Sequence, residues 1–399
     1  MDDKAEKKKE EGESSTFCCF SSIHPPCRNA VGSVRDLAKN RAEGGGQISA
    51  WAAQNDSGHL APFKISRRPT GPQDVRLNIL YCGICHTDLH QIKNQLQESI
   101  YPMVPGHEIV GVVTEVGAEV EAFKVGQHVG VGCIVHSCRN CHSCQLGLEQ
   151  YCPEMVWSYN SIDADGTLTE GGYSTAIVCN QSYVLRIPDN LPLDAAAPLL
   201  CAGITVWSPM KHFKMVGKGK HFGLVGLGGL GHMAIKFARA FGMEVTVFSR
   251  SPAKEKEAKE VLGAHNFVVS TDEKQMKAAA KTIDYIIDTI SANHALDPYL
   301  ALLKTNGNIV LVGLPKKSLQ ISAASLIYGR HFVGGSLIGG IEETQEMLDF
   351  CGEHNITCMI EKVPITYINT AMARLEKSDV HYRFVIDIAN TLKDNANGV

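Results

Sequence analysis

The chain has no apolar run long enough to cross a membrane and no excess of positive charge. No stretch of about 18 consecutive apolar residues occurs, so the sequence predicts no membrane-spanning helix. Lys and Arg number 38 against 42 Asp and Glu, which leaves a formal net charge of −4. Because no net basic field attracts phosphates, we expect neither a nucleic acid nor a membrane as partner.

Aromatic residues are sparse at 7%, and the rest of the composition is ordinary except for cysteine. Hydrophobic residues at 44% and charged residues at 20% exclude collagen, coiled coil and wholesale disorder. At roughly 100–200 residues per domain, 399 residues predict two or three domains. In a chain of this length, 14 cysteines do not indicate a small disulfide scaffold. They leave metal ligands, reactive thiols and small buried hydrophobes as alternatives.

Residues 1–46 differ from the rest of the chain. A mixed run of acidic and basic residues leads through three cysteines to a glycine triplet. The segment fits neither a secretory signal, which needs a longer apolar stretch, nor a transit peptide, which is poor in acids. We therefore expect a flexible N-terminal extension and, given the many cysteines, a reducing cytoplasm.

Two regions with different predicted secondary structure follow this extension. Between residues 47 and 200, short β-type runs separated by turn signals predict a partly closed β domain; these runs are 75–81, 108–117, 128–135 and 183–188. Between residues 201 and 340, strands alternate with helices, which predicts a parallel sheet with crossover helices. The expected strands are 221–226, 244–249, 266–269, 284–289 and 308–313, and the expected helices are 232–242, 253–263 and 294–304. A helical pattern at 342–355 opens the last segment, 341–399.

A glycine-rich turn joins the first strand of this alternation to its helix. Gly226, Gly228 and Gly231 form G-x-G-x-x-G in GLGGLG. In that context the first glycine permits a tight turn, the second lets backbone approach a pyrophosphate, and the third lets helix and strand pack closely. Since the helix N-terminus faces the phosphates, the segment predicts a dinucleotide site.

The end of the next strand distinguishes the two nicotinamide cofactors. An acidic residue about 20 positions further on would hold the 2′-hydroxyl of NAD. The sequence instead has Ser249, Arg250 and Ser251, with Lys254 one turn later. These side chains offer donors to a 2′-phosphate and no carboxylate repels it, so we expect NADP(H) rather than NAD(H).

Four cysteines share one short segment at the spacing C-x2-C-x2-C-x7-C. They are Cys138, Cys141, Cys144 and Cys152. Four thiolates within reach of one ion are what a closed, structural zinc site needs. An iron–sulfur cluster also uses four thiolates, but the usual bacterial run ends in a three-residue interval. The pattern therefore favours zinc.

A second metal-site candidate is discontinuous. Cys85, His107 and Cys201 offer the three borderline-soft ligands that a catalytic zinc uses when one position stays open for substrate. Cys82 and Cys85 also form C-x-x-C, which is typical of a thioredoxin-like dithiol at a helix start. Because this C-x-x-C precedes a β-rich region, we favour the metal.

These motifs resemble one family. CGICHTDLHQIKN, YPMVPGHE, the four-cysteine loop, APLLCAGIT, GLGGLGH and HYRFV look like the zinc-dependent medium-chain alcohol dehydrogenases, in particular the plant cinnamyl alcohol dehydrogenases. The similarity runs from Trp51 to Leu392. It implies an α/β protein with a GroES-like catalytic domain at 47–200, an inserted doubly wound Rossmann domain at 201–340, and a return to the catalytic domain at 341–399.

The resemblance also implies roles for particular residues. Cys85, His107 and Cys201 would bind catalytic zinc, and Glu108 would ligate when the fourth position is vacant. A second set would act on the proton: Thr87 and His90 as its relay and Asp88 as the carboxylate that orients them. The implied cofactor contacts are Thr87, Gly226, Leu227, Gly228, Gly229, Leu230, Gly231, Ser249, Arg250, Ser251, Lys254, Gly313, Ser336 and Ile338. The implied substrate pocket consists of Leu96, Cys133, Trp157, Leu337 and Ile338.

Two pocket positions depart from the cinnamyl enzymes. Glu98 stands where those enzymes tend to place an apolar residue, and Leu337 replaces an aromatic one. Trp157 matches the aromatic wall, which suits a flat phenylpropenyl aldehyde. A carboxylate at the mouth would disfavour one methoxylated aldehyde or favour a polyol.

The resemblance predicts an enzyme of lignin and phenylpropanoid type. It would interconvert cinnamyl alcohols and cinnamaldehydes by hydride transfer with NADP(H), with two zinc ions per chain, as a homodimer joined at the sheet edge near residues 330–340. One alternative is another plant zinc alcohol dehydrogenase, acting on mannitol or on an allylic terpenoid alcohol such as 8-hydroxygeraniol. Others are a C=C reductase and a zinc-stabilised nucleotide-binding module without activity. The complete set of metal ligands with Thr87 and His90 argues against the C=C reductase, and an open zinc site has no purpose in the inactive module.

Overall fold

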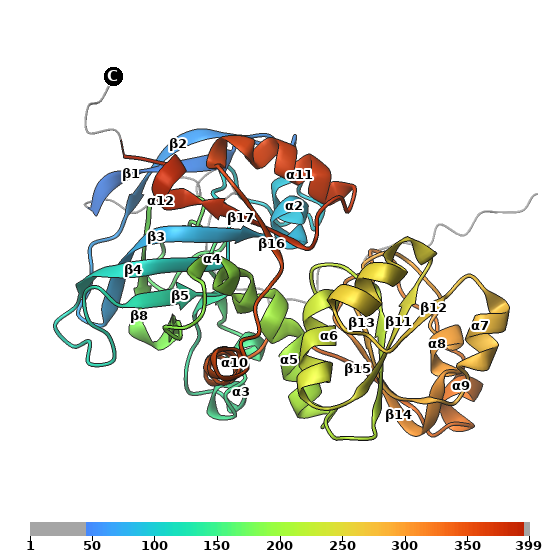
Figure 1. Ribbon diagram of the computed structural model, residues 1–399. Helices are drawn as coiled ribbons and strands as arrows, with labels where there is room; N and C mark the ends of the chain where they lie inside the picture. Colours follow the sequence, from blue (N-terminus) through green and yellow to red (C-terminus); the bar gives the residue numbers. More distant parts are fainter. Residues whose placement is uncertain (1–44, 395–399) are drawn as a thin grey trace, which may run out of the picture.

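The computed structural model describes residues 45–394 (Figure 1). The predicted flexible extension, residues 1–46, lies outside these residues except for its last two glycines, which begin β1 (Gly45–Ala53). Cys18, Cys19 and Cys27 therefore also lie outside the described part of the chain.

The larger sheet draws strands from both ends of the described chain. Its order is β16 (Ile360–Val363), β17 (Arg383–Asp387), β3 (Asp74–Ile84), β4 (Ile109–Val116), β5 (His128–Val131) and β9 (Val184–Arg186), with β8 (Ala176–Asn180) also paired to β3. Strand β3 alternates in burial over its first half, where Val75, Leu77 and Ile79 face the core. Strand β17 pairs with β3, and β16 pairs with β17. The C-terminal segment therefore adds the last two strands to a sheet that the N-terminal half begins.

Smaller elements surround this sheet. Two further antiparallel pairs are β1 with β2 (Leu60–Arg67) and β6 (Ile134–His136) with β7 (Val156–Trp157). The helices here are α2 (His86–Ile92), α3 (His142–Gln145), α4 (Leu193–Ala196), α11 (Ile368–Glu376) and α12 (Ile388–Thr391). The 3₁₀ helices are Glu149–Tyr151, Gln181–Tyr183, Ala197–Leu200 and Ile365–Tyr367.

The second sheet is six-stranded and parallel throughout. Its order is β12 (Asn266–Val269), β11 (Glu244–Ser249), β10 (His221–Val225), β13 (Ile283–Asp288), β14 (Leu303–Leu311) and β15 (Phe332–Gly335). The helices of this domain are α6 (Gly231–Ala240), α7 (Glu273–Ala278), α8 (Asp297–Leu300) and α9 (Ala323–Ile327). The strand order reverses at β10, as in a doubly wound dinucleotide-binding sheet, so the predicted α/β fold class is confirmed.

One predicted helix in this domain is present in mixed form, and another is much shorter than expected. The segment 253–263 is helical to Val261, with a 3₁₀ turn at Pro252–Lys254, two α-helical residues and a π-helix at Glu257–Val261. The segment expected as a helix at 294–304 is helical only at Asp297–Leu300. Leu303 instead pairs with Ile283 in the parallel ladder, because burial between neighbouring strands outweighs the helical spacing of the sequence.

Two segments cross between the domains. The first is α5 (Ala202–His212), and the second is residues 336–340, which lead into α10 (Ile341–His354). Trp207 of α5 is fully buried and packs edge-on against Phe237 of α6, with ring centroids 5.3 Å apart. It also contacts Phe350 of α10 at 4.9 Å. These ring contacts pack α5 against α6 and α10.

Within residues 45–394, no single helix is long and apolar enough to cross a membrane. One bent pair, Leu193–Leu200 with Ala202–His212, meets the length and hydropathy criteria together, with an angle of 53° between its halves.

Replacing Leu77 by Ala should destabilise the domain that contains β3. Leu77 lies in the middle of β3 with no exposed surface, so the substitution removes buried methyl groups and leaves a cavity. We expect a loss of about 2–5 kcal/mol in the free energy of unfolding. Leu314→Ala, at a site that is 71% exposed, is the matched control and should change it by less than about 0.5 kcal/mol. Equal denaturant midpoints for the two variants would contradict the assigned core.

Candidate active site and metal centres

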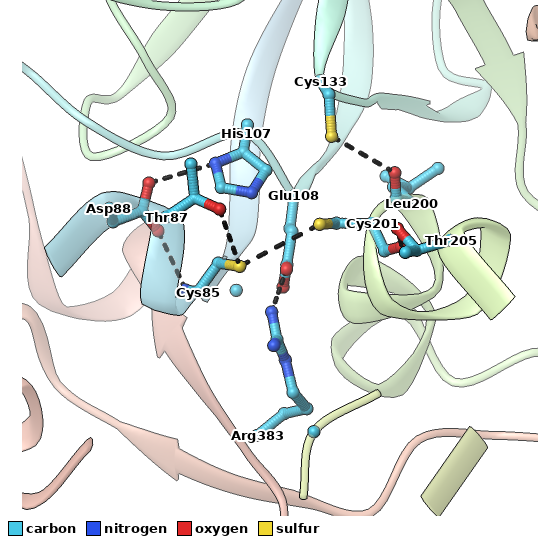
Figure 2. Close-up of polar contacts among 12 residues, drawn as sticks. Cys85, Thr87, Asp88, His107, Glu108, Cys133, Leu200, Cys201, Thr205 and Arg383 are labelled. Atoms are coloured by element: carbon cyan, nitrogen blue, oxygen red, sulfur yellow. Dashed lines mark hydrogen bonds and ion pairs between the residues drawn. The ribbon is translucent and has the colours of Figure 1, made fainter. Parts of the chain in front are cut away.

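The fold brings four potential metal ligands from three segments into one buried cluster. Cys85 follows β3 and is the N-cap of α2, His107 and Glu108 precede β4, and Cys201 is the N-cap of α5. One ligand atom from each residue lies within 4.8 Å of the others, and the two sulfurs are 4.0 Å apart (Figure 2). Two thiols and an imidazole at this spacing fit a zinc ion that keeps a position for substrate.

Asp88 contacts two residues of this cluster, Cys85 and His107. Its carboxylate accepts a hydrogen bond from the backbone N–H of Cys85 at 2.9 Å and from the Tyr173 hydroxyl at 3.1 Å. Its other oxygen lies 3.0 Å from Nδ1 of His107. Because Nδ1 is occupied in this way, Nε2 is left for the ligand cluster. Burial alone would lower the pKa of His107, but the neighbouring Asp88 carboxylate raises it well above its usual range.

The thiol pair has an asymmetric electrostatic environment. The pKa of Cys85 lies well below its usual range, because the Cys201 thiol donates a hydrogen bond to it and the Arg383 charge lies nearby. A thiolate is the form that binds a metal, so the environment already favours the ligand state of Cys85.

Thr87 and His90 lie on the helix that begins at this cluster. The Thr87 hydroxyl is 3.6 Å from Sγ of Cys85, so it lies at the border of the ligand cluster. His90 is half-buried one turn later, with Nδ1 2.8 Å from Oε1 of Gln95. The geometry leaves Nε2 of His90 as the nitrogen for a relay, and the relay itself stays a prediction.

Arg383 is a site residue that the motif analysis did not assign. It lies at the start of β17 and forms a buried ion pair with Oε1 of Glu108 (Figure 2). A Cβ atom at Gly83 would lie 1.9 Å from Oε2 of Glu108, so glycine is required there. Oε2 itself is buried without a protein partner among the described residues, which fits a carboxylate that can turn toward a metal. Burial raises the pKa of Glu108, and the charge of Arg383 opposes this shift.

The glycine-rich turn has the geometry that its pattern predicts. Gly226 has φ +90°, a conformation that favours glycine. A Cβ at Gly231 would approach the carbonyl oxygen of Gly226 to 2.3 Å, whereas one at Gly228 would meet nothing within 4 Å. The turn is thus closed toward its helix and open at Gly228, which fits the approach of a pyrophosphate. Leu227, Gly229 and Leu230 are the other residues of this turn, which ends where α6 begins.

Two side chains hold this turn. Lys254 donates to the carbonyl oxygen of Leu227 at 2.7 Å. Nδ1 of His232 donates to the carbonyl of Gly229 at 2.8 Å, while its Nε2 accepts from the backbone N–H of Met359 at 3.2 Å. This requires a neutral imidazole, and burial indeed lowers the pKa of His232 to about 3.

The residues expected near a 2′-phosphate lie at the carboxyl end of β11. Arg250 is exposed and Ser249 is half-buried. The Ser251 hydroxyl accepts from the backbone N–H of Ala253 at 3.1 Å. Gly313 and Ser336 follow β14 and β15, at the same edge of the parallel sheet, where open α/β folds bind their ligands.

The four-cysteine loop forms the second cluster. One sulfur from each of Cys138, Cys141, Cys144 and Cys152 lies within 4.8 Å of the others. Backbone N–H groups of Cys141 and Glu154 donate to Sγ of Cys138 and of Cys152, each at 3.3 Å. Because these donors stabilise thiolates, the loop fits a closed tetrahedral zinc site.

The proposed pocket residues differ in exposure. Cys133 and Ile338 are buried, and Trp157 is half-buried in β7. Leu96 and Leu337 are exposed by 39% and 37%. Cys133 lies beside the metal cluster, with its sulfur 3.9 Å from the Leu200 carbonyl (Figure 2). The departing residue Glu98 is exposed.

Cys85 was expected to precede a β-rich region and not to begin a helix, and this expectation was wrong. Cys85 does begin a helix, α2, because the capping interactions with Asp88 outweigh the β-type pattern around it. The sulfur of Cys82 nevertheless packs against Gly106 and Gly172 in the core, whereas that of Cys85 faces Cys201. All cysteines in the described residues are free.

Comparison with known proteins identifies the family. Residues 71–189 match the alcohol dehydrogenase GroES-like domain, and residues 229–353 match the zinc-binding dehydrogenase domain. A relative from Pinus taeda named "Probable cinnamyl alcohol dehydrogenase" is 56% identical over 348 residues, which cover 87% of this chain and 98% of the relative. The chain belongs to the zinc-binding alcohol dehydrogenase family. The predicted family is confirmed.

Other members of this dehydrogenase family carry two different substrate names. A relative from Medicago sativa named "Probable mannitol dehydrogenase" is 61% identical over 341 residues, covering 86% of this chain and 95% of the relative. A solved cinnamyl alcohol dehydrogenase from Sorghum bicolor has 54% identity and a TM-score of 0.86, covering 88% of this chain and all of that one. A Helicobacter pylori structure complexed with NADP(H) has 42% identity and a TM-score of 0.82, with the same coverage.

The two cysteine clusters of the dehydrogenase should respond differently to substitution. Cys85→Ser should abolish turnover and leave the melting temperature nearly unchanged, because α2 keeps its cap, whereas Cys141→Ser should lower it by several degrees. Metal analysis should find about two zinc ions per wild-type chain and about one in each variant. Cys351→Ser, a buried thiol in neither cluster, is the control and should retain both ions. Indistinguishable melts for Cys85→Ser and Cys141→Ser would contradict this division.

Proposed function

We propose that this dehydrogenase interconverts cinnamyl alcohols and cinnamaldehydes with NADP(H). The observation that carries the proposal is the buried cluster of Cys85, His107 and Cys201, which Arg383 links directly to the dinucleotide turn. An open metal position beside a nucleotide site is the arrangement needed for hydride exchange at an alcohol carbon. The cinnamyl names of the Pinus taeda and Sorghum bicolor relatives support the substrate class.

The bound groups supply the reactive chemistry: zinc acts as a Lewis acid toward the substrate oxygen, and the nicotinamide exchanges the hydride. The chain positions these groups and moves the proton. Asp88 fixes the orientation of His107, and Arg383 holds Glu108. The Thr87 hydroxyl would accept the proton of the substrate oxygen while it releases its own toward His90, which is half-buried and would exchange that proton with water.

The carboxyl edge of the parallel sheet would hold the cofactor. Gly228 leaves space for the pyrophosphate, and Arg250 with Ser249 and Ser251 receives the 2′-phosphate. Lys254 uses one N–H on Leu227, which leaves two donors for the phosphate. The Helicobacter pylori relative, solved with NADP(H), supports this cofactor.

Mannitol is the second candidate substrate. Glu98 is exposed and its carboxylate can accept hydrogen bonds from a polyol, and the Medicago sativa relative carries the mannitol name. Trp157, half-buried in β7, and buried Cys133 instead offer an apolar wall to a planar aromatic substrate. This wall is the reason to place cinnamyl substrates first.

We further propose that the enzyme is a homodimer and that it works in a reducing compartment such as the cytoplasm. Strand β15 is at the edge of its sheet, and nearby Ile327, Tyr328 and Phe332 are 73%, 90% and 54% exposed. An unpaired edge flanked by exposed apolar side chains favours pairing with a second copy. The eleven described cysteines are all free, which favours a reducing compartment.

A panel of substrates tests the proposed reaction. With NADPH, we expect kcat/KM for coniferaldehyde and for sinapaldehyde to exceed that for an aliphatic aldehyde by at least about tenfold. The reason is that only a flat aromatic substrate packs fully against the apolar wall formed by Trp157 and Cys133. Absorbance of NADPH follows each reaction, and oxidation of mannitol with NADP is measured in parallel. Equal rates on all three aldehydes, or preferred turnover of mannitol, would refute the cinnamyl assignment.

Arg250→Asp should change the cofactor preference. The new carboxylate repels a 2′-phosphate and can bind a 2′-hydroxyl, so the ratio of kcat/KM for NADPH to that for NADH should fall by at least about tenfold. Lys256→Asp makes the same change of charge at a site with an 83% exposed side chain and should leave the ratio unaltered. An unchanged ratio in the Arg250 variant would remove this residue from cofactor selection.

A further inference from the structure

The four-cysteine loop, residues 138–152, makes direct contact with the second crossing between the domains. The phenol oxygen of Tyr151 accepts a hydrogen bond from the backbone N–H of Leu337 at 3.0 Å. The carboxylate of Glu149 accepts one from the backbone N–H of Ile341, the first residue of α10, at 3.2 Å. An acidic group at this end of a helix is favourable, so the loop supplies α10 with a cap from outside its own sequence.

A third contact is made by backbone alone. A Cβ atom at Gly340 would lie 1.8 Å from the carbonyl oxygen of Gly147, so a side chain at position 340 would force the loop away. Gly340 has φ −70°, which any residue can adopt. Its lack of a side chain is therefore explained by this close approach and not by its conformation.

The same crossing is also fixed on its other side. A Cβ at Gly339 would lie 2.6 Å from the side chain of Ile204 in α5, which is the first crossing. Ile338 has φ +35°, a conformation that a β-branched residue adopts only when its surroundings impose it. Ile338 is buried and Leu337 is exposed by 37%, so it is the backbone of the crossing, held by Tyr151 and packed against Ile204, that lies between α5 and the loop.

We infer that the four-cysteine loop positions the substrate cleft, with Tyr151 and Glu149 as positioning residues for Leu337 and Ile338. This inference rests on the proposed function, which places those two residues in the wall of the cleft. The loop thus acts on substrate affinity through the backbone of the crossing, in addition to stabilising its own fold. Figure 1 shows α3 of the loop beside α10.

The effect of removing one contact should be local. Tyr151 is 46% exposed and Leu337 is 37% exposed, so water can replace the phenol and the whole protein loses little stability. The position of the crossing is then no longer fixed by the loop. A net contribution typical of one hydrogen bond corresponds to about two- to tenfold in an equilibrium constant.

The test compares full-length Tyr151→Phe and Glu149→Ala with wild type. We expect hydrogen exchange of the backbone at 336–344 to accelerate by at least about threefold, and KM for coniferaldehyde to rise about two- to tenfold with kcat within about twofold. The melting temperature and zinc content should remain those of wild type. Glu149→Gln keeps an acceptor oxygen and should recover most of the wild-type KM.

A matched control is available beside the loop. Glu154→Ala removes an exposed carboxylate two residues beyond Cys152. It should leave the exchange of 336–344 and KM unchanged. Wild-type exchange in the Tyr151 and Glu149 variants, or a fall in melting temperature with unaltered KM, would overturn the inference.

Failure of the proposed function gives a different result. If the wild-type enzyme reduces no cinnamaldehyde, the proposed substrate is wrong, but the exchange of 336–344 still tests the contact. Accelerated exchange confined to that segment in both variants would then support the positioning role of the loop.

Discussion

The buried ion pair between Glu108 and Arg383 is the contact on which the arrangement of the active site depends (Figure 2). The side chains are 0% and 5% exposed, and a buried charge without its partner is strongly destabilising. Glu108 precedes β4 and Arg383 begins β17, 275 residues later in the chain. The carboxylate of Glu108 therefore has its charged partner only when the C-terminal segment has returned to pair with β3.

The same pair links the metal cluster to the nucleotide domain. A Cβ at Gly229 would lie 2.9 Å from the Arg383 side chain, so the glycine turn packs directly on the guanidinium. Next to Arg383, the ring of Tyr382 stacks on His232 at 4.9 Å, and His232 holds the Gly229 carbonyl. Since Arg383 and Tyr382 both pack on the turn and its helix, the metal cluster and the cofactor site are supported by the same returning segment.

What could be predicted from the sequence was information contained within short segments. The four-cysteine spacing and G-x-G-x-x-G need only local geometry, as does the alternation of strand and helix, and the fold class follows from them. Leu303 shows the limit, because its place in β14 is decided by pairing with Ile283 and not by its neighbours in sequence. Arg383 shows it again, since a lone arginine in HYRFV carries no sign of a carboxylate 275 residues away.

The contacts of the four-cysteine loop were hidden for a related reason. Their donors are the backbone N–H groups of Leu337 and Ile341, which every residue except proline possesses, so no side-chain pattern marks them. The seven-residue interval before Cys152 is nevertheless where Gly147, Glu149 and Tyr151 lie. These three residues make the contacts of the loop with the second crossing. The longer interval that distinguishes this spacing from an iron–sulfur run therefore also holds the residues that contact the crossing.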